Sequence, residues 1–403
     1  MMSLCLLPVL RRLRRSLCVA GLSLGLAAAA LAQPLAPPQV GARHFVLLDL
    51  TAGQTLAERD ADTPTDPASL TKLMTAYVVF TALREGRITL AQRVPVSRRA
   101  WDERLGRPSL MFIDTTMTPT VDELLHGMIV QSGNDASVAL AEAVAGSVET
   151  FVAMMNRQAQ AWGLRNTAFA NVTGMSQPGH RSSARDIATI ATRIVQDFPE
   201  FYRYYSLREF TFNNIRQDNR NLLLRRDPSV DGMKTGFTSA AGFCLVASAQ
   251  RQLPNLGPEG RSPGPRRLLS VVMGSASLQS RADESQRLLN WGFGAFDAIK
   301  LFDGGRAIAT PEVWKGRQPS AALGLARDLV LSVPRGEADR LQTAIEREDP
   351  LLAPLAAGQR VGTLRVTTRA GTPVAEAPLV VLQPVEAAGL VGRSWDALRL
   401  WIR

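Results

Sequence analysis

The sequence predicts an α+β fold for residues 33–303, a small β domain for residues 304–388 and an amphipathic helix for residues 389–403. Three observations lead to this prediction. A β-hairpin pattern comes first, a block of helical periodicity follows it, and strand patterns then return. Helices and strands segregated in this way are typical of helices packed against an antiparallel sheet. Beyond residue 303 the apolar residues follow strand periodicity, and helical spacing returns only at the C-terminus.

The elements of the first domain follow from local periodicity. Residues 44–50 and 55–57 are predicted as the two strands of the hairpin, with a turn at 51–54. Helical spacing of apolar residues predicts further elements at 67–85, 121–146 (interrupted at 132–134), 151–162 and 183–198. Later strands are expected at 210–213, 243–249 and 267–273, and a last helix at 281–293. The Gly- and Pro-rich segment 253–265 is predicted to be an insertion between two strands.

The second domain is predicted from period-two alternation. Strands are expected at 329–333, 361–368 and 378–382, with a turn at 369–372. Because no helical segment separates these strands, they indicate a mostly β domain.

Residues 389–403 form an amphipathic pattern. On a helical wheel the apolar side chains, including two tryptophans, fall within about 140° and most charged side chains lie opposite. At about 22 Å the helix is too short to cross a hydrocarbon core of ~30 Å, but tryptophans suit the headgroup region. A membrane surface is therefore its predicted partner; the alternative is a terminal helix docked on its own domain.

The first 32 residues predict a secretory signal peptide. Four arginines precede an apolar stretch at 17–31, which ends in a small-x-small triplet at 30–32 ahead of a Pro-rich segment. The Ala-rich end favours cleavage over an uncleaved N-terminal anchor. Two of the three cysteines would leave with the signal, so the mature chain would keep Cys244 alone and form no intramolecular disulfide. The expected location is the periplasm, at the outer face of the cytoplasmic membrane.

The composition limits the kinds of partner and of catalytic group that the protein can use. The net charge of +10 becomes +6 once the four signal arginines are removed, which suits anionic lipid or cell-wall polymer. No nucleic-acid partner is expected. The three histidines are scattered and the cysteines are not paired in spacing, so neither a zinc site nor any other cofactor is predicted. The chemistry must therefore use hydroxyls, amines, amides or carboxylates. His180 and Cys244 are expected to be a surface residue and a buried small hydrophobe, respectively.

Three short motifs carry the predicted chemistry. They are S-x-x-K at 69–72, S-x-N at 132–134 and K-T-G at 234–236. Each motif alone is common and has little specificity. Their occurrence together and in this order is typical of active-site serine acyltransferases.

Ser69 is the predicted nucleophile and Lys72 its base. Three positions apart on a predicted helix, the two side chains project from one face. Pro67 suits the first helical position, so Ser69 would lie in the first turn, where N–H groups lack acceptors. Whether Asp66 occupies the Ser69 N–H as a cap is left open. Lys72 can accept the serine proton only if burial and a second cation, for which Lys234 is the candidate, lower its pKa.

The other polar motif residues are expected around the substrate. Ser132 can pass a proton to the leaving amine, and Asn134 can hold Lys72 or the substrate's peptide carbonyl. Lys234 and Thr235, at a strand edge, can receive a substrate carboxylate.

Backbone groups complete the predicted site. Gly236 would let the substrate backbone lie against the strand edge. The backbone N–H groups of Ser69 and Phe237 are the predicted oxyanion donors.

Three longer segments place these motifs in a familiar context. They are DPASLTKLMTAYVV (66–79), DELLHGMIVQSGNDASVALAEAVAG (122–146) and NRNLLLRRDPSVDGMKTGFTSAAGFCLVASA (219–249). Together they closely resemble serine-type D-alanyl-D-alanine carboxypeptidases of the low-molecular-mass penicillin-binding protein 5/6 group. The resemblance runs from about residue 43 to residue 300.

The resemblance implies a fold, an activity and two more site residues. The fold would be the penicillin-binding/β-lactamase-like transpeptidase domain, with its helical subdomain. Ser69 would attack the penultimate D-Ala carbonyl of a peptidoglycan stem ending in D-Ala-D-Ala, release the terminal D-Ala, and be acylated by β-lactams. Arg281 resembles the family's arginine for the substrate carboxylate, and Arg220 a second arginine of the pocket.

The sequence departs from the family pattern at one position, and three other functions are weighed against the carboxypeptidase. Phe237 follows K-T-G where well-known relatives often carry His, which could alter deacylation. Residues 166–186 contain no Glu, which disfavours a class A β-lactamase, so Lys72 is again the expected activator of water. A murein DD-endopeptidase is the enzymatic alternative, disfavoured by the extra β domain. An inactive wall-binding scaffold is the other, disfavoured because all three motifs are intact.

Overall fold

The structure, a computed structural model, describes residues 36–105, 109–252 and 264–402. The signal peptide expected at 1–32 and most of the insertion expected at 253–265 lie outside these residues. Residues 37–403 belong to one structural unit, which contains both the predicted α+β domain and the predicted β domain.

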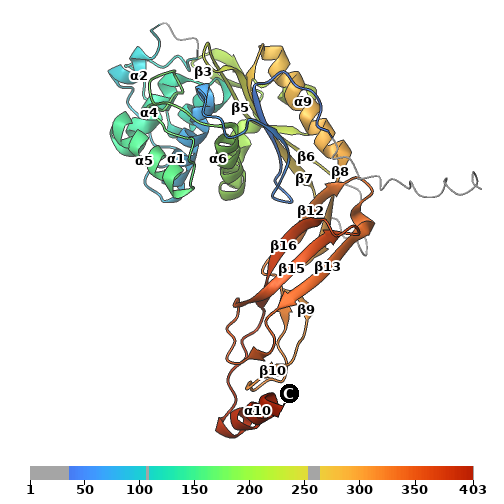
Figure 1. The fold of residues 1–403 in the computed structure, drawn as a ribbon. Helices are drawn as coiled ribbons and strands as arrows, with labels where there is room; N and C mark the ends of the chain where they lie inside the picture. The colour runs from blue at the N-terminus through green and yellow to red at the C-terminus, as the bar shows by residue number, and fades with distance from the viewer. Residues whose placement is uncertain (1–35, 106–108, 253–263, 403) are drawn as a thin grey trace, which may run out of the picture. The chain divides into compact units, whose positions relative to one another are not determined.

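An antiparallel five-stranded sheet of order β2-β1-β7-β6-β5 forms the centre of the first domain (Figure 1). Its strands are β1 (His44–Asp49), β2 (Gln54–Arg59), β5 (Val230–Thr238), β6 (Gly242–Arg251) and β7 (Arg266–Ser275). The predicted hairpin is β1–β2. The K-T-G motif lies in β5, an edge strand that periodicity alone had not delimited.

The sheet separates two hydrophobic cores. Side chains of neighbouring strand residues point to opposite faces, so Phe45 and Leu47 of β1 face one core while Val46 faces the other. The helices that cover the faces, with one small hairpin, come from the following segments. They are α1 (Lys72–Arg84), α2 (Arg98–Asp102), α3 (Val121–Val130), α4 (Asn134–Ala145), α5 (Val148–Ala161), α6 (Ala184–Asp197), α7 (Pro199–Tyr202), α8 (Leu223–Arg226) and α9 (Leu278–Ala295), with η1 (Ala68–Thr71), η2 (Arg203–Ser206), β3 (Glu209–Phe212) and β4 (Ile215–Asp218). The core with Leu47 lies under α9, and the core with Val46 lies under α6 and the other large helices (Figure 1). The predicted α+β class is confirmed.

The start of the helix expected at 67–85 differs from the prediction. Residues 68–71 form the 3-10 turn η1, and the α-helix α1 begins only at Lys72. Ala68 has a φ of 46°, in the left-handed region that non-glycine residues rarely adopt. The Asp66 carboxylate accepts the N–H of Ala68 at 2.8 Å, not that of Ser69. The nucleophile candidate therefore lies in a constrained turn. Asp66 caps the N–H of Ala68 and leaves the N–H of Ser69 available.

The second domain is built from short strands, as predicted, but its first strand lies before the predicted boundary at residue 304, because β8 pairs with β12. They are β8 (Phe296–Phe302), β9 (Ala307–Ala309), β10 (Val313–Trp314), β11 (Leu323–Gly324), β12 (Leu329–Pro334), β13 (Leu341–Arg347), β14 (Leu351–Leu352), β15 (Arg360–Thr368) and β16 (Pro373–Val381). A five-stranded sheet has the order β13-β15-β16-β11-β9, and β8 pairs with β12.

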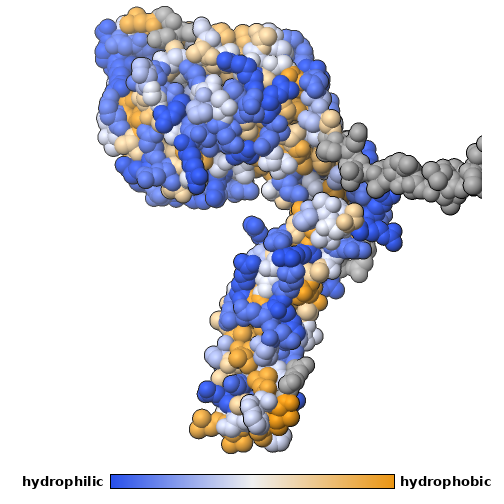
Figure 2. Space-filling view, in the orientation of Figure 1, coloured by the Kyte–Doolittle hydropathy of each residue, from blue (hydrophilic) through white to orange (hydrophobic). Residues whose placement is uncertain are grey.

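The C-terminal helix α10 (Leu390–Ile402) follows this domain. Its hydrophobic residues gather on the surface near the C-terminus (Figure 2), and Val391 and Trp401 are 86% and 85% exposed. Its polar side contacts the domain: the Asp396 carboxylate accepts the Lys315 N–H at 2.7 Å, and Arg399 lies over the Trp314 ring. The helix is thus docked by one side while its apolar side faces solvent.

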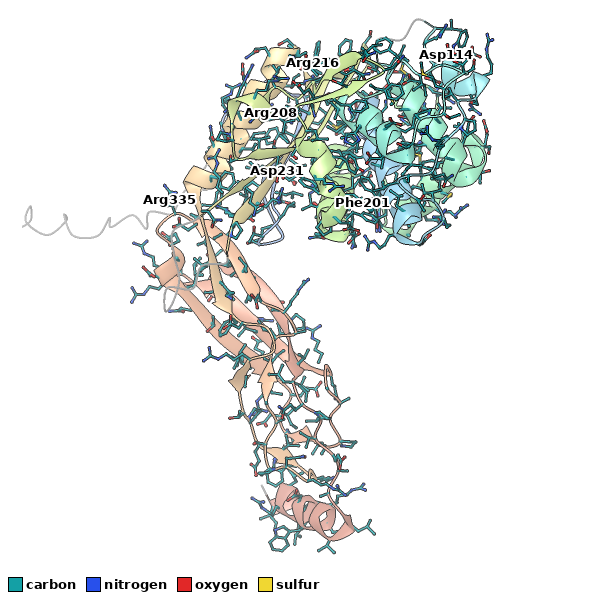
Figure 3. The ribbon with its side chains drawn as sticks, turned by 180° about the vertical axis from the view of Figure 1, so that it is seen from behind. Asp114, Phe201, Arg208, Arg216, Asp231 and Arg335 are labelled. Atoms are coloured by element: carbon teal, nitrogen blue, oxygen red, sulfur yellow. The ribbon has the colours of Figure 1, made fainter. Side chains whose placement is uncertain are left out.

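The segment containing α7 joins the helices to the sheet. Phe201 stacks on Phe80 of α1, with ring centroids 5.0 Å apart, and the Tyr202 hydroxyl donates to Asp231 of β5 at 3.0 Å. Phe201 lies among the helices and Asp231 on the sheet (Figure 3). This contact fixes β5, which carries K-T-G, against the helices that carry the other two motifs.

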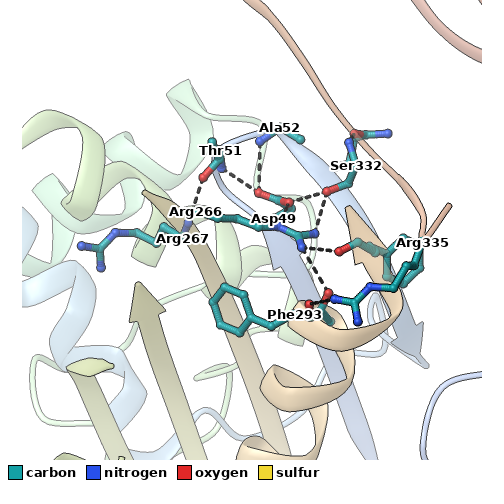
Figure 4. A network of polar contacts seen from close by, with 11 residues as sticks. Asp49, Thr51, Ala52, Arg266, Arg267, Phe293, Ser332 and Arg335 are labelled. Carbon is teal, nitrogen blue, oxygen red and sulfur yellow. Dashed lines mark hydrogen bonds and ion pairs between the residues drawn. The ribbon is translucent and has the colours of Figure 1, made fainter. Parts of the chain in front are cut away.

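A buried ion pair links the first domain to β12. Arg266 Nε donates to Asp49 Oδ2 at 2.6 Å, and both side chains are fully buried. The Ser332 hydroxyl donates to the same carboxylate and accepts from Arg266 Nη2 at 2.8 Å (Figure 4). The backbone N–H groups of Thr51 and Ala52 also donate to Asp49. Because the carboxylate is fully hydrogen-bonded, the cost of burying both charges is largely offset.

No single helix in the described part of the chain is long and apolar enough to cross a membrane, although the bent pair α4–α5 meets the length and hydropathy criteria together. Among the same described residues, no group of three or more His, Cys, Asp or Glu side chains is arranged to hold a metal ion.

Candidate active site

Lys72 lies at the centre of the candidate site. Its Nζ is 3.1 Å from Ser69 Oγ, 2.8 Å from Asn134 Oδ1 and 2.6 Å from the carbonyl oxygen of Thr173. The side chain of Lys72 is only 1% exposed. The structure therefore brings the first two motifs together, and adds a carbonyl from the loop between α5 and α6.

The hydrogen bonds of Lys72 suit a neutral amine. Burial lowers the pKa of Lys72 to about 7; the Glu103 carboxylate opposes this shift, the Arg220 cation adds to it, and Asp135 opposes it. A neutral amine has two hydrogens and one lone pair. Asn134 Oδ1 and the Thr173 carbonyl are pure acceptors and take both hydrogens. In the neutral form the lone pair is then left for the Ser69 hydroxyl proton, whereas in the protonated form the third N–H donates to Ser69 Oγ.

Ser132 is held in a strained backbone conformation at the start of α4. Its φ is 68°, and its hydroxyl is buried with no hydrogen-bond partner among the described residues. The Gly133 N–H donates to the Gly127 carbonyl, which holds this turn in place. A buried hydroxyl without a partner gains a hydrogen bond when a ligand arrives.

Lys234 lies beside these groups on edge strand β5. Its Nζ donates to the Thr235 carbonyl at 2.9 Å, and it is buried. Burial lowers the pKa of Lys234 well below its usual value, and the positive charges of Lys72, Arg220 and Arg281 lower it further. The positive charge that lowers the pKa of Lys72 is that of Arg220, and not that of Lys234, which was the candidate from sequence.

Besides its predicted role beside the substrate, Gly236 has a reason within the fold. A Cβ atom at Gly236 would lie 3.1 Å from the Ala68 Cβ and 3.2 Å from the Ser69 nitrogen. The missing side chain thus lets β5 approach the turn that carries the nucleophile. Phe237 is 54% exposed, and its ring packs on Phe243 with centroids 4.3 Å apart.

The two arginines transferred by resemblance lie next to β5. Arg281, in α9, donates to the Gly236 carbonyl at 3.0 Å, and burial lowers its pKa to about 10. Arg220 donates to Ser109 Oγ at 2.8 Å, and burial lowers its pKa too. Arg281 Nη2 also lies 3.5 Å from the Arg220 carbonyl oxygen. Both therefore add positive charge beside K-T-G.

Sequence reasoning missed two groups at the site. Thr173 contributes its backbone carbonyl, which leaves no signal in the side-chain sequence. Asp135 accepts hydrogen bonds from the backbone N–H groups of Met111, Phe112 and Ile113, and so fixes the loop beside the start of α4. Its position directly after S-x-N was the one available signal.

The prediction that His180 is a surface residue is wrong. Its side chain is only 6% exposed, because its loop folds back over η1 and its ring is hydrogen-bonded on both nitrogens. Cys244 is buried in β6, as expected, and burial raises the pKa of its thiol to about 11.

The fold and the Ser–Lys site together define the class of active-site serine acyltransferases. The family model for D-alanyl-D-alanine carboxypeptidase matches residues 30–275, and the model for the penicillin-binding protein 5 C-terminal domain matches residues 296–387. The chain therefore belongs to the D-alanyl-D-alanine carboxypeptidase family and is a serine-type carboxypeptidase of the penicillin-binding protein 5/6 type. The resemblance and the function inferred from sequence are confirmed.

Individual relatives agree with this assignment. The chain is 41% identical to D-alanyl-D-alanine carboxypeptidase DacA of Haemophilus influenzae, over 91% of each chain. It is also 41% identical to DacC of Escherichia coli, over 90% of this chain and 89% of that one. The crystal structure of penicillin-binding protein 5 from Haemophilus influenzae superposes with a TM-score of 0.81, covering 87% of this chain and 99% of that one at 41% identity. Penicillin-binding protein D2 from Listeria monocytogenes, in its ampicillin-bound form, has a TM-score of 0.55 at 26% identity and covers 64% of this chain and 99% of that one.

Proposed function

We propose that this carboxypeptidase trims peptidoglycan stems through an acyl-enzyme on Ser69. The observation that carries the proposal is the Lys72 amine, buried and 3.1 Å from Ser69 Oγ, with its other two hydrogen bonds made to pure acceptors. Lys72 takes the Ser69 proton as Oγ attacks the carbonyl of the penultimate D-Ala. The C–N bond then breaks, the terminal D-Ala leaves with a proton relayed through Ser132, and an ester remains on Ser69. Water activated by Lys72 hydrolyses that ester.

Charges around β5 would hold the leaving residue. Lys234, Thr235 and Arg281 would receive the terminal carboxylate, and Arg220 would add positive charge nearby. The N–H groups of Ser69 and Phe237 would donate to the oxyanion, a role that needs only backbone atoms. A β-lactam carries a comparable carboxylate beside a strained amide, so we expect it to acylate the same serine. The ampicillin-bound relative supports this expectation.

A digest of defined stem peptides tests this function. Purified protein would be given a monomeric pentapeptide stem and, separately, a cross-linked dimer, with products identified by mass. We expect loss of one D-Ala from the pentapeptide with the cross-link intact. Cleavage of the cross-link in preference to the pentapeptide would instead identify a DD-endopeptidase, and no cleavage of either would favour the wall-binding scaffold.

We further propose that the mature protein lies in the periplasm, attached to the outer face of the cytoplasmic membrane through α10. The exposed apolar side of α10 supports this, with Leu390, Trp395 and Ile402 at 81%, 62% and 71% exposure. Asp396 and Arg399 contact the β domain from the other side of the helix. The helix could then enter a headgroup layer without leaving the domain that presents it.

Replacing Trp395 and Trp401 by serine is expected to remove binding to vesicles that contain anionic lipid. Removing each indole takes a large apolar area away from the membrane interface. Hydrolysis of a soluble stem peptide should stay at the wild-type rate, because the active site is unchanged. Co-sedimentation measures the bound fraction. Leu278→Ser, which removes an exposed apolar side chain from α9, is the matched control and should bind as the wild type does. Undiminished binding of the double variant would mean that α10 is not the anchor.

A further inference from the structure

His180 lies in the loop between α5 and α6, and its ring contacts the turn η1, which carries Ser69. Its loop is fastened at its ends by two antiparallel bridges, Ala168 with Arg181 and Thr65 with Ser182. Its side chain is buried, and neither the motifs nor the mechanism above gives it a role. The ring is nevertheless bonded to a residue inside the S-x-x-K motif, since its Nε2 lies 2.8 Å from Thr71 Oγ1.

The hydrogen bonds around the ring fix its tautomer. The N–H of Ala170 donates to His180 Nδ1 at 3.0 Å, so Nδ1 must carry a lone pair. The proton of the neutral ring is therefore on Nε2, which donates to Thr71 Oγ1. Burial lowers the pKa of His180 to about 4; the Asp66 carboxylate opposes this shift and the Lys72 ammonium adds to it. His180 is thus a neutral and permanent donor near pH 7.

The donation from His180 sets the direction of the next bond. With its lone pair occupied by His180, the hydroxyl of Thr71 is free to use its proton for the Ala68 carbonyl, at 2.9 Å. Ala68 is the residue with φ of 46° that directly precedes Ser69. A neutral histidine, a hydroxyl and a carbonyl therefore form one directional chain that ends at the peptide group joining Ala68 to the nucleophile.

The same peptide group is also packed by the loop. A Cβ atom at Gly174 would overlap the Ala68 carbonyl and come within 2.9 Å of the Ser69 nitrogen. One residue earlier, the Thr173 carbonyl accepts from Lys72. The loop thus contacts both partners of the reaction, the base through Thr173 and the peptide group of the nucleophile through Gly174 and the His180–Thr71 chain.

We propose that His180 is a positioning residue that, through Thr71, holds the strained Ala68–Ser69 peptide in the geometry needed for acylation. This inference rests on the proposed role of Ser69 as nucleophile. An unrestrained left-handed alanine would relax toward a commoner backbone conformation. Ser69 Oγ would then leave the position in which it meets Lys72, and the rate of acylation would fall even though every motif residue remained.

Replacing His180 by glutamine or asparagine distinguishes its role as a hydrogen-bond donor from a role in packing alone. A glutamine side chain can place an N–H near the position of Nε2, whereas asparagine reaches only the position of Nδ1. His180→Asn is expected to lower the rate of acylation by a fluorescent penicillin about tenfold, and His180→Gln to stay within about threefold of the wild type. His126→Asn, the same change at a half-buried histidine of α3, is the control and should acylate as the wild type does.

Variants of Thr71 test the same hydrogen-bond chain independently. Thr71→Val keeps the volume but removes the hydroxyl, and is expected to match His180→Asn; Thr71→Ser keeps the hydroxyl and should retain most of the rate. The double variant His180→Asn/Thr71→Val should be no slower than either single variant, since one chain is being broken twice. Melting temperatures, measured in parallel, ensure that all rates refer to folded protein.

Several results would overturn the inference. It fails if His180→Asn acylates at the wild-type rate, if His180→Gln loses as much as His180→Asn, or if the two losses simply multiply in the double variant. Failure of the proposed function would look different, because wild-type protein would then not be labelled on Ser69 at all.

Discussion

Ser69→Ala is expected to lower the release of D-Ala by at least about a thousandfold and to remove covalent labelling by β-lactams altogether. A methyl group cannot form an ester, and the removal of a nucleophile leaves only the small contribution of the surrounding polar groups. Among the residues that the structure describes, the Ser69 side chain is hydrogen-bonded to Lys72 alone, so the fold should survive the change. Mass spectrometry of the intact protein after incubation with penicillin measures the adduct directly.

The control for this experiment is Ser206→Ala. The Ser206 hydroxyl is exposed and donates to the Arg203 carbonyl in η2, outside the three motifs. That variant should be labelled at the wild-type rate. A penicillin adduct that persists in Ser69→Ala would show that another group is the nucleophile, and the assignment would have to be abandoned.

Lys72→Met is expected to lower the rate of acylation by at least about a hundredfold, because the variant has no base for the Ser69 proton. The change should not unfold the protein. The pKa of Lys72 is lowered in the folded state, so protonation favours the unfolded chain, and this cost is fully present below about pH 7. Methionine fills a similar volume without that cost. It also leaves Asn134 Oδ1 and the Thr173 carbonyl without a donor, so the two effects oppose each other and the melting temperature of Lys72→Met near pH 7 should stay close to that of the wild type.

The same lowered pKa predicts the pH dependence of the wild-type enzyme. If neutral Lys72 is the base, acylation should fall about tenfold per pH unit below about pH 7 and level off above it. Stopped-flow measurement of penicillin acylation between about pH 5 and pH 9 gives the profile. A Glu103→Gln variant removes a carboxylate that raises the pKa of Lys72, so its profile should shift to lower pH. A flat wild-type profile, or near-normal acylation by Lys72→Met, would exclude Lys72 as the base.

Much of the fold and the candidate site could be predicted because the relevant signals are local. The apolar run of β1, bounded by a turn, and the helical spacing in α6 depend on neighbours a few positions apart. Ser69 and Lys72 are also close in sequence, so their meeting required only the correct turn. Assigning the other two motifs to the same site depended on the resemblance to a family, since sequence spacing does not show that distant segments meet.

The failures have a common cause. His180 was expected at the surface because glycine and proline surround it, yet a hydrogen bond to Thr71, 109 positions earlier, keeps it buried. The room that Gly236 leaves for Ala68 was not predicted either, because only its place beside the substrate was considered. In both cases the decisive neighbour lies far away along the chain, where local composition carries no information.

From the amino-acid order alone, the α+β class, the β domain, the amphipathic terminus and the candidates for the reacting groups can be deduced, because each depends on residue type and short-range periodicity. The tertiary structure alone decides whether those groups can react. The lowered pKa of Lys72 comes from its burial, and in the neutral form its lone pair is left for Ser69 because Asn134 and the Thr173 carbonyl accept its two hydrogens. The burial of Lys72 and its contacts with these acceptors arise only when segments that are distant in the sequence pack together.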